Sequence, residues 1–114
     1  MSTRSVIAYE DDNDKCVGVY CHYDGYPNHI FPIIDSMSYN DVRTMVEYSL
    51  VNGGIRNIEN DGEYETFNEP SKRNEWLFKS VFAHENGVDY TYMKRKDGSI
   101  FATCCNGREI ENPY

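Results

Sequence analysis

The alternation of apolar and polar residues near the N-terminus predicts the first two strands of a sheet. Val6–Tyr9 is a short apolar run, and a charged turn follows it. Within Cys16–His22, the apolar residues Val17, Val19 and Cys21 occupy every second position, which is the period of a half-buried strand. We expect these two segments to pair as an antiparallel hairpin.

Apolar residues at helical spacing predict two helices. The first has Ser38 or Asn40 as its cap, an apolar stripe that begins at Val42, and Gly53-Gly54 as its end. The second is expected to begin at Ser71 and to carry an apolar stripe of Trp76, Leu77, Val81 and Phe82. We therefore expect helices centred near Met45 and Phe78.

The segment between the second strand and the first helix has no clear pattern. Its apolar residues from His29 to Ile34 favour a short helix, but Pro32 removes a main-chain donor and is tolerated only in the first helical turn. The sequence leaves this segment open.

The C-terminal third predicts a second hairpin. Tyr90–Met93 and Ile100–Cys104 flank a basic segment that ends in Asp97-Gly98, a dipeptide typical of tight hairpin turns. Ile55–Ile58 predicts one more short strand or an extended segment. These elements indicate one α+β domain over residues 1–114, in which N- and C-terminal hairpins build an antiparallel sheet packed with two helices. A loosely held polar tail is expected from about residue 107.

The charge of the chain narrows its expected partners. The 114 residues carry a formal net charge of -8, which repels phosphate backbones and disfavours direct nucleic-acid binding. An acidic surface suits basic protein partners or the imitation of a nucleic acid. No apolar run approaches the ~20 residues of a membrane helix, and no secretory leader is evident, so no membrane association is expected.

The cysteines predict free thiols rather than a metal centre. Cys16, Cys21, Cys104 and Cys105 lack the paired Cys-x-x-Cys spacing of a zinc site. Without a leader sequence, a reducing cytosol is the expected compartment. We therefore expect no metal and no cofactor.

The residues with most chemical potential lie in Tyr20–Pro27, where the second strand ends. This segment holds three tyrosines, a histidine and a carboxylate, followed by Gly25. His22 and Asp24 lie two residues apart, so they can act as an acid–base pair or fix a turn. Tyrosine rings at such a place can stack on a ligand or close the rim of a core. The candidate binding residues are Arg4, Tyr20, His22, Tyr23, Asp24 and Tyr26, and no catalytic residue is assigned.

Two motifs carry a resemblance to a known family. Thr3-Arg4-Ser5-x-Ile7 and Tyr20-x-His22-Tyr23-Asp24-Gly25-Tyr26-Pro27 resemble a family of small proteins encoded by tailed bacteriophages. The family pattern usually has tryptophan where this chain has Tyr23. Gly53-Gly54-Ile55 and the tyrosine-rich C-terminal hairpin are similar to its later elements. The resemblance implies phage origin and a host-cytoplasm setting, and it implies no particular reaction.

Small acidic phage proteins outside the virion often bind a host protein, which indicates a function by analogy. We expect an accessory protein that inhibits or diverts a host factor, as an anti-defence blocker or a nucleic-acid mimic. One alternative is a sponge for a small signalling nucleotide. Another is a small enzyme in which His22 is the general base, Asp24 orients it and Arg4 holds an anionic substrate. The sequence leaves the oligomeric state open.

Overall fold

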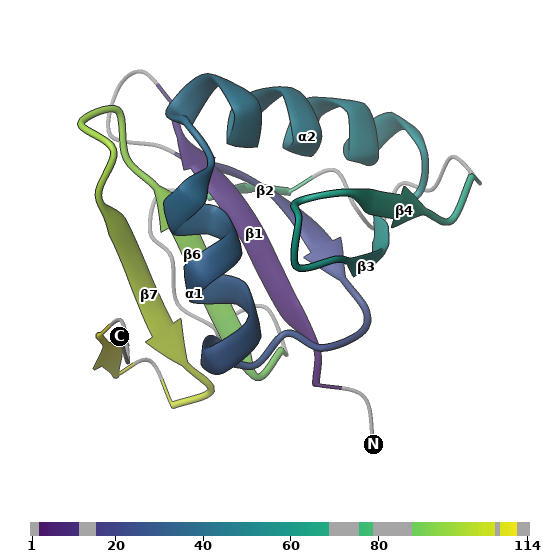
Figure 1. Ribbon diagram of the computed structural model, residues 1–114. Helices are drawn as coiled ribbons and strands as arrows, with labels where there is room; N and C mark the ends of the chain where they lie inside the picture. The colour runs from purple at the N-terminus through teal and green to yellow at the C-terminus, as the bar shows by residue number, and fades with distance from the viewer. Residues whose placement is uncertain (1–2, 12–15, 69–75, 79–87, 107, 112–114) are drawn as a thin grey trace.

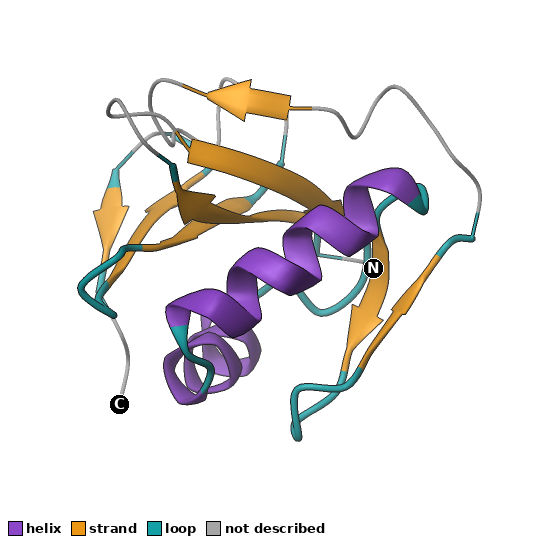
Figure 2. Ribbon diagram, turned by 90° about the horizontal axis from the view of Figure 1, so that it is seen from above, coloured by secondary structure: helices purple, strands orange, loops and turns teal. Residues whose placement is uncertain are grey.

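Two helices cover one face of a mixed β-sheet (Figures 1 and 2). The computed structural model describes residues 3–11, 16–68, 76–78, 88–106 and 108–111. Among these residues, no helix is long and apolar enough to span a membrane. The helices are α1 (Pro27–Ser36) and α2 (Tyr39–Val51), and the strands are β1 (Ser5–Glu10), β2 (Cys16–Cys21), β3 (Ile55–Ile58), β4 (Tyr64–Thr66), β5 (Trp76–Phe78), β6 (Tyr90–Lys94), β7 (Ile100–Cys104) and β8 (Glu109–Ile110).

Both predicted hairpins are present. The first, β1–β2, is antiparallel from Ser5 opposite Cys21 to Glu10 opposite Cys16. The second, β6–β7, is closed by a turn in which Gly98 has a φ of 92°, a conformation that favours glycine. The alternation of apolar residues and the turn dipeptide therefore predicted these local pairings correctly.

The sheet is mixed rather than antiparallel throughout, which corrects the sequence-based expectation. Its strand order is β4-β3-β2-β1-β6-β7-β8, with β5 also paired to β2. β1 runs parallel to β6, and β2 runs parallel to β3. Both helices lie in the connection between β2 and β3, and a long crossover of this kind lets the chain return in the same direction.

The helix predicted near Phe78 is wrong in the described residues. Trp76–Phe78 is the strand β5, which pairs antiparallel with β2, Gly18 lying opposite Trp76. Aromatic residues favour strands, and the start of β2 offers a free edge for pairing. The remainder of that predicted helix, residues 69–75 and 79–87, lies outside the described residues.

The second helix is instead α1, in the segment that the sequence left open. Pro27 begins this helix, where its missing N–H costs nothing, and Pro32 lies inside it on the exposed side. The opposite side buries Ile30, Phe31 and Ile34 against the sheet. Burial of this apolar side outweighs the hydrogen bond that Pro32 removes.

Helix α2 matches its prediction closely. Ser38 Oγ accepts a hydrogen bond from the main-chain N–H of Asp41 at 3.1 Å and caps the helix. Val42, Met45 and Val46 are buried against the sheet. The main core therefore lies between the helices and the inner sheet face, to which Ile7, Val19 and Tyr92 also contribute.

The C-terminal segment expected to be a loosely held tail contains strand β8. Glu109 and Ile110 pair with Thr103 and Ala102 of β7. In Figure 1 this short strand lies at the opposite edge of the sheet from β4. The chain therefore uses part of this segment as the outermost strand.

Candidate functional site

The segment after β2 is held in place by main-chain hydrogen bonds. The N–H groups of His22 and Tyr23 donate to the carbonyl oxygens of Ile55 and Arg56, both at 3.0 Å. The N–H of Gly25 donates to Thr3 O at 2.9 Å. The predicted site is therefore a strand end that is hydrogen-bonded to β3 on one side and to Thr3, which precedes β1, on the other.

Gly25 is required because the backbone of Thr3 and Ser5 passes close to it. A Cβ at position 25 would lie 2.6 Å from Ser5 Oγ and 2.8 Å from Thr3 O, well inside van der Waals contact. The positive φ of this turn belongs to Asp24, at 57°, a conformation that aspartate tolerates better than most residues. The hydroxyl of the buried Tyr92, in β6, donates a hydrogen bond to Gly25 O at 2.6 Å and so ties the turn to the sheet.

Four side chains form an aromatic patch beside this strand end: Tyr20, His22, Tyr23 and Phe67. The Tyr20 hydroxyl and His22 Nδ1 are 2.7 Å apart and share a hydrogen bond. The His22 ring packs edge-on against Tyr23, with centroids 4.5 Å apart, and against Phe67 at 5.8 Å. Tyr23 and Phe67 remain 38% and 37% exposed, so the patch offers apolar surface to a partner.

The hydrogen bond to Tyr20 determines what His22 can do. When the Tyr20 hydroxyl donates to Nδ1, the proton of the neutral imidazole lies on Nε2. Nε2 can then donate to a carbonyl or phosphate oxygen of a ligand. The patch thus combines aromatic surface with a positioned polar group.

Sequence reasoning missed Phe67, although its exposed ring packs against His22 in the patch. It directly follows β4, and its N–H donates to Gly54 O at 3.2 Å. That hydrogen bond holds Phe67 beside the start of β3, and the pairing of Ile55 with Cys21 brings the start of β3 beside the end of β2. No local pattern around residue 67 could have shown this, because the contact depends on long-range strand pairing.

Tyr26 and Asp24 lie beside the patch without joining it. The Tyr26 ring contacts His29, with centroids 5.8 Å apart, and His29 Nε2 bonds to Ile58 O at 2.7 Å. Asp24 is exposed. In the part of the chain that the structure describes, no hydrogen bond joins Asp24 to His22, so these two residues do not form an acid–base pair here.

Arg4 lies at the same end of the sheet as His22. Ser5 pairs with Cys21, so the two residues occupy the next positions along adjacent strands. The Arg4 main chain binds Asp89: its N–H donates to Asp89 Oδ2 at 3.1 Å, and its carbonyl oxygen accepts from Asp89 N at 3.0 Å. No described hydrogen bond or ion pair joins the Arg4 guanidinium to the patch.

Two buried ionisable side chains next to the site, Cys21 and Tyr92, are uncharged at neutral pH. Burial raises the pKa of the Cys21 thiol to about 12, so it stays protonated at neutral pH and is a poor nucleophile. Burial also raises the pKa of the Tyr92 phenol above its usual value. Within the described residues, no group of three or more histidine, cysteine or acidic side chains could hold a metal ion.

Comparison of the chain with protein-family models, with curated proteins and with solved structures gave no match. An exposed aromatic surface with a fixed imidazole is suited to binding. Within the described residues, His22 Nδ1 is bonded to a hydroxyl and to no carboxylate.

Proposed function

We propose that this chain is an accessory binding protein that engages a host protein through the aromatic patch and so inhibits or diverts that protein. The observation that carries the proposal is the exposure of Tyr23 and Phe67, whose rings both pack against a hydrogen-bonded His22. Aromatic residues with few rotatable bonds are typical anchors of protein interfaces. The resemblance to small phage proteins supports a host-cell setting and an anti-defence role.

The geometry favours a binding role over the enzymatic alternative. A general base needs a group that orients its imidazole, and a hydroxyl rather than a carboxylate bonds to His22 Nδ1. Tyr20 is a weak partner for an imidazolium in comparison with aspartate. The net charge of -8 adds electrostatic attraction to a basic partner, as in nucleic-acid mimicry.

The nucleotide sponge remains the second candidate, because Tyr23 and Phe67 also offer ring faces to a base. Mass spectrometry of the protein as purified, under native conditions, separates the two functions. A bound nucleotide, lost in a Tyr23→Ser variant, would favour the sponge. A protein without added mass would favour the protein-binding role.

The protein-binding role is tested by quantitative capture from a bacterial lysate. We expect the wild-type chain to enrich a protein that a Tyr23→Ser, Phe67→Ser variant does not enrich. The matched control is Tyr48→Ser on α2, which removes a tyrosine that is also exposed but lies outside the patch. Equal enrichment by all three proteins would refute a role for the patch.

A further inference from the structure

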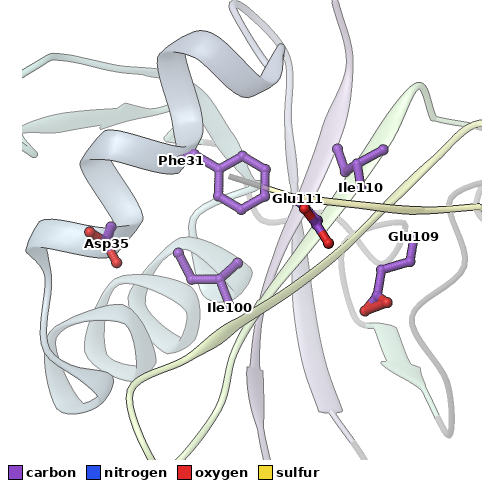
Figure 3. A pocket seen from close by; sticks show the side chains of 6 residues that line it. All are labelled: Phe31, Asp35, Ile100, Glu109, Ile110 and Glu111. Atoms are coloured by element: carbon purple, nitrogen blue, oxygen red, sulfur yellow. The ribbon is translucent and has the colours of Figure 1, made fainter. Parts of the chain in front are cut away.

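A small cleft opens at the other edge of the sheet, between α1 and the last two strands (Figure 3). Phe31, Ile100 and Ile110 supply its apolar lining, and Asp35, Glu109 and Glu111 supply its charged lining. Its volume is about 270 Å³. This is below the roughly 300–1,000 Å³ of typical small-molecule pockets, so the cleft suits one or two side chains of a larger partner.

The charge of the cleft is entirely negative. All three ionisable residues that line it are acidic, and in the described part of the chain none of the three forms an ion pair. Arg108 precedes Glu109 and is exposed, and two other nearby cations, Lys94 and Arg95, contact other groups. Lys94 Nζ donates to Ile34 O at 3.1 Å, and the Arg95 guanidinium lies 5.1 Å from the centre of the Phe101 ring. A ligand that neutralises these carboxylates must therefore be cationic.

Strand β8 adds an unpaired main-chain edge beside the cleft. Cys104 N donates to Arg108 O at 2.9 Å, and Ala102 pairs with Ile110. Residues that bond to a neighbouring antiparallel strand alternate with residues that do not. The main-chain N–H and C=O of Glu109 consequently point away from β7, where β8 has no further neighbour in the described sheet.

We propose that this edge binds an extended basic peptide of a partner protein, which adds a strand to β8. Residues directly opposite each other in paired strands point to the same face. The peptide residue opposite Ile110 therefore faces α1 and fills the cleft over Phe31. Its two neighbours point to the opposite face, as Glu109 does, and lie beside Glu109 and Glu111. The expected recognition sequence is basic–apolar–basic, with main-chain hydrogen bonds along Glu109.

The same carboxylates disfavour a second copy of this chain as the occupant. Edge-to-edge pairing of two β8 strands would bring Glu109 and Glu111 close to their own copies, and like charges across a strand pair are destabilising. The acidic residues thus protect an open edge against self-association while they attract a lysine- or arginine-bearing strand.

Fluorescence anisotropy with a labelled peptide of alternating lysine and valine tests this inference. We expect Glu109→Lys with Glu111→Lys to weaken binding by roughly tenfold or more, since two favourable ion pairs become repulsive. The control, Glu63→Lys with Glu65→Lys, makes the same charge change on edge strand β4, where the same acidic–apolar–acidic pattern surrounds Tyr64. It should change binding by less than about twofold.

Absence of binding to the wild-type protein would overturn the inference. Equal weakening by both charge reversals, or equal binding of a peptide in which the same residues no longer alternate, would also overturn it. A dimer that Ile110→Lys dissociates would assign the edge to a second copy and would also overturn it. The Tyr23→Ser, Phe67→Ser variant should bind the peptide normally, so this test is independent of the proposed function.

Discussion

Lys94 holds the C-terminal end of α1 onto the sheet through Ile34. This lysine is only 3% exposed, and its Nζ donates to the Ile34 carbonyl oxygen at 3.1 Å. The last carbonyl groups of a helix lack partners within the helix, and a cation there also complements the helix dipole. The same carbonyl accepts from Met37 N at 3.2 Å, so the helix end is bonded twice.

Truncation of Lys94 separates the contribution of its apolar stem from that of its ammonium group. We expect Lys94→Ala to lower the free energy of unfolding by about 2–4 kcal/mol, because it leaves a cavity and removes the hydrogen bond. Lys94→Met should cost about 1 kcal/mol, since the stem is kept and Ile34 O retains one donor. Urea unfolding measures both variants. A methionine variant less stable than the alanine variant would contradict this account.

The close approach at Gly25 predicts a clear difference between two glycines. Gly25→Ala should destabilise the protein by about 1–3 kcal/mol, because the new Cβ overlaps Ser5 and the Thr3 carbonyl. At Gly62 a Cβ would meet nothing within 4 Å, although φ is +88°. Gly62→Ala should therefore cost only about 1 kcal/mol. Thermal unfolding of both variants measures the two losses of stability. Equal losses for Gly25→Ala and Gly62→Ala would rule out the steric explanation.

The raised pKa of Cys21 predicts a loss of stability in alkaline solution. Burial raises this pKa from 9.0 to about 12. Below pH 9 the thiol is protonated in both the folded and the unfolded chain, so its contribution to the free energy of unfolding is fully present. Above pH 9 the unfolded chain loses the proton first, so stability falls as pH rises, by up to about 1.4 kcal/mol per pH unit.

A Cys21→Val variant should lose this contribution to the pH dependence. Its free energy of unfolding between pH 9 and pH 10 should fall less steeply than that of the wild-type protein. Urea titrations at several pH values provide the comparison. Parallel curves for the two proteins would show that Cys21 does not titrate differently on unfolding.

The positions of the four cysteines predict two classes of thiol. Cys16 and Cys21 are buried and lie on opposite faces of β2, whereas Cys104 is half-buried and Cys105 is exposed. Hydrogen bonding from the Asn106 main chain lowers the pKa of the Cys104 thiol, which favours its reactive thiolate. A maleimide reagent should label Cys104 and Cys105 in the folded protein and the other two only after unfolding. Peptide mass mapping identifies the labelled positions, and early labelling at Cys16 would contradict the buried assignment.

The sequence predicted those features that depend on neighbours along the chain. The alternation in Val17–Cys21, the expected cap and the Asp97-Gly98 turn each determine a local conformation, and each is present. For the cap, the structure selects Ser38 from the two candidates, Ser38 and Asn40. The missed features depend on partners distant in sequence. Ser5 pairs with Tyr90 in a parallel register, and this choice of partner is not encoded in either strand alone.

In the candidate site, too, the sequence indicated the residues that are close together along the chain and missed the contacts between distant ones. The sequence indicated the strand end and the residues Tyr20, His22 and Tyr23, because they lie within one short motif. It could not show that Phe67 completes the patch, because this contact depends on the β2–β3 pairing. Nor could it show that no hydrogen bond joins Asp24 to His22 in the described residues, because that depends on the turn held by Thr3.

The parallel pairing of β1 with β6 has a consequence for the synthesis of this protein on the ribosome. β1 is made first, but one of its two neighbours comprises residues Tyr90–Lys94. Contacts that join such distant parts of a chain slow folding, because the intervening residues must first be ordered. When the nascent chain emerges, β1, the central strand of the sheet, can therefore pair with β2 on one side only. The pairing of β1 with β6 can form only after Tyr90–Lys94 has left the exit tunnel.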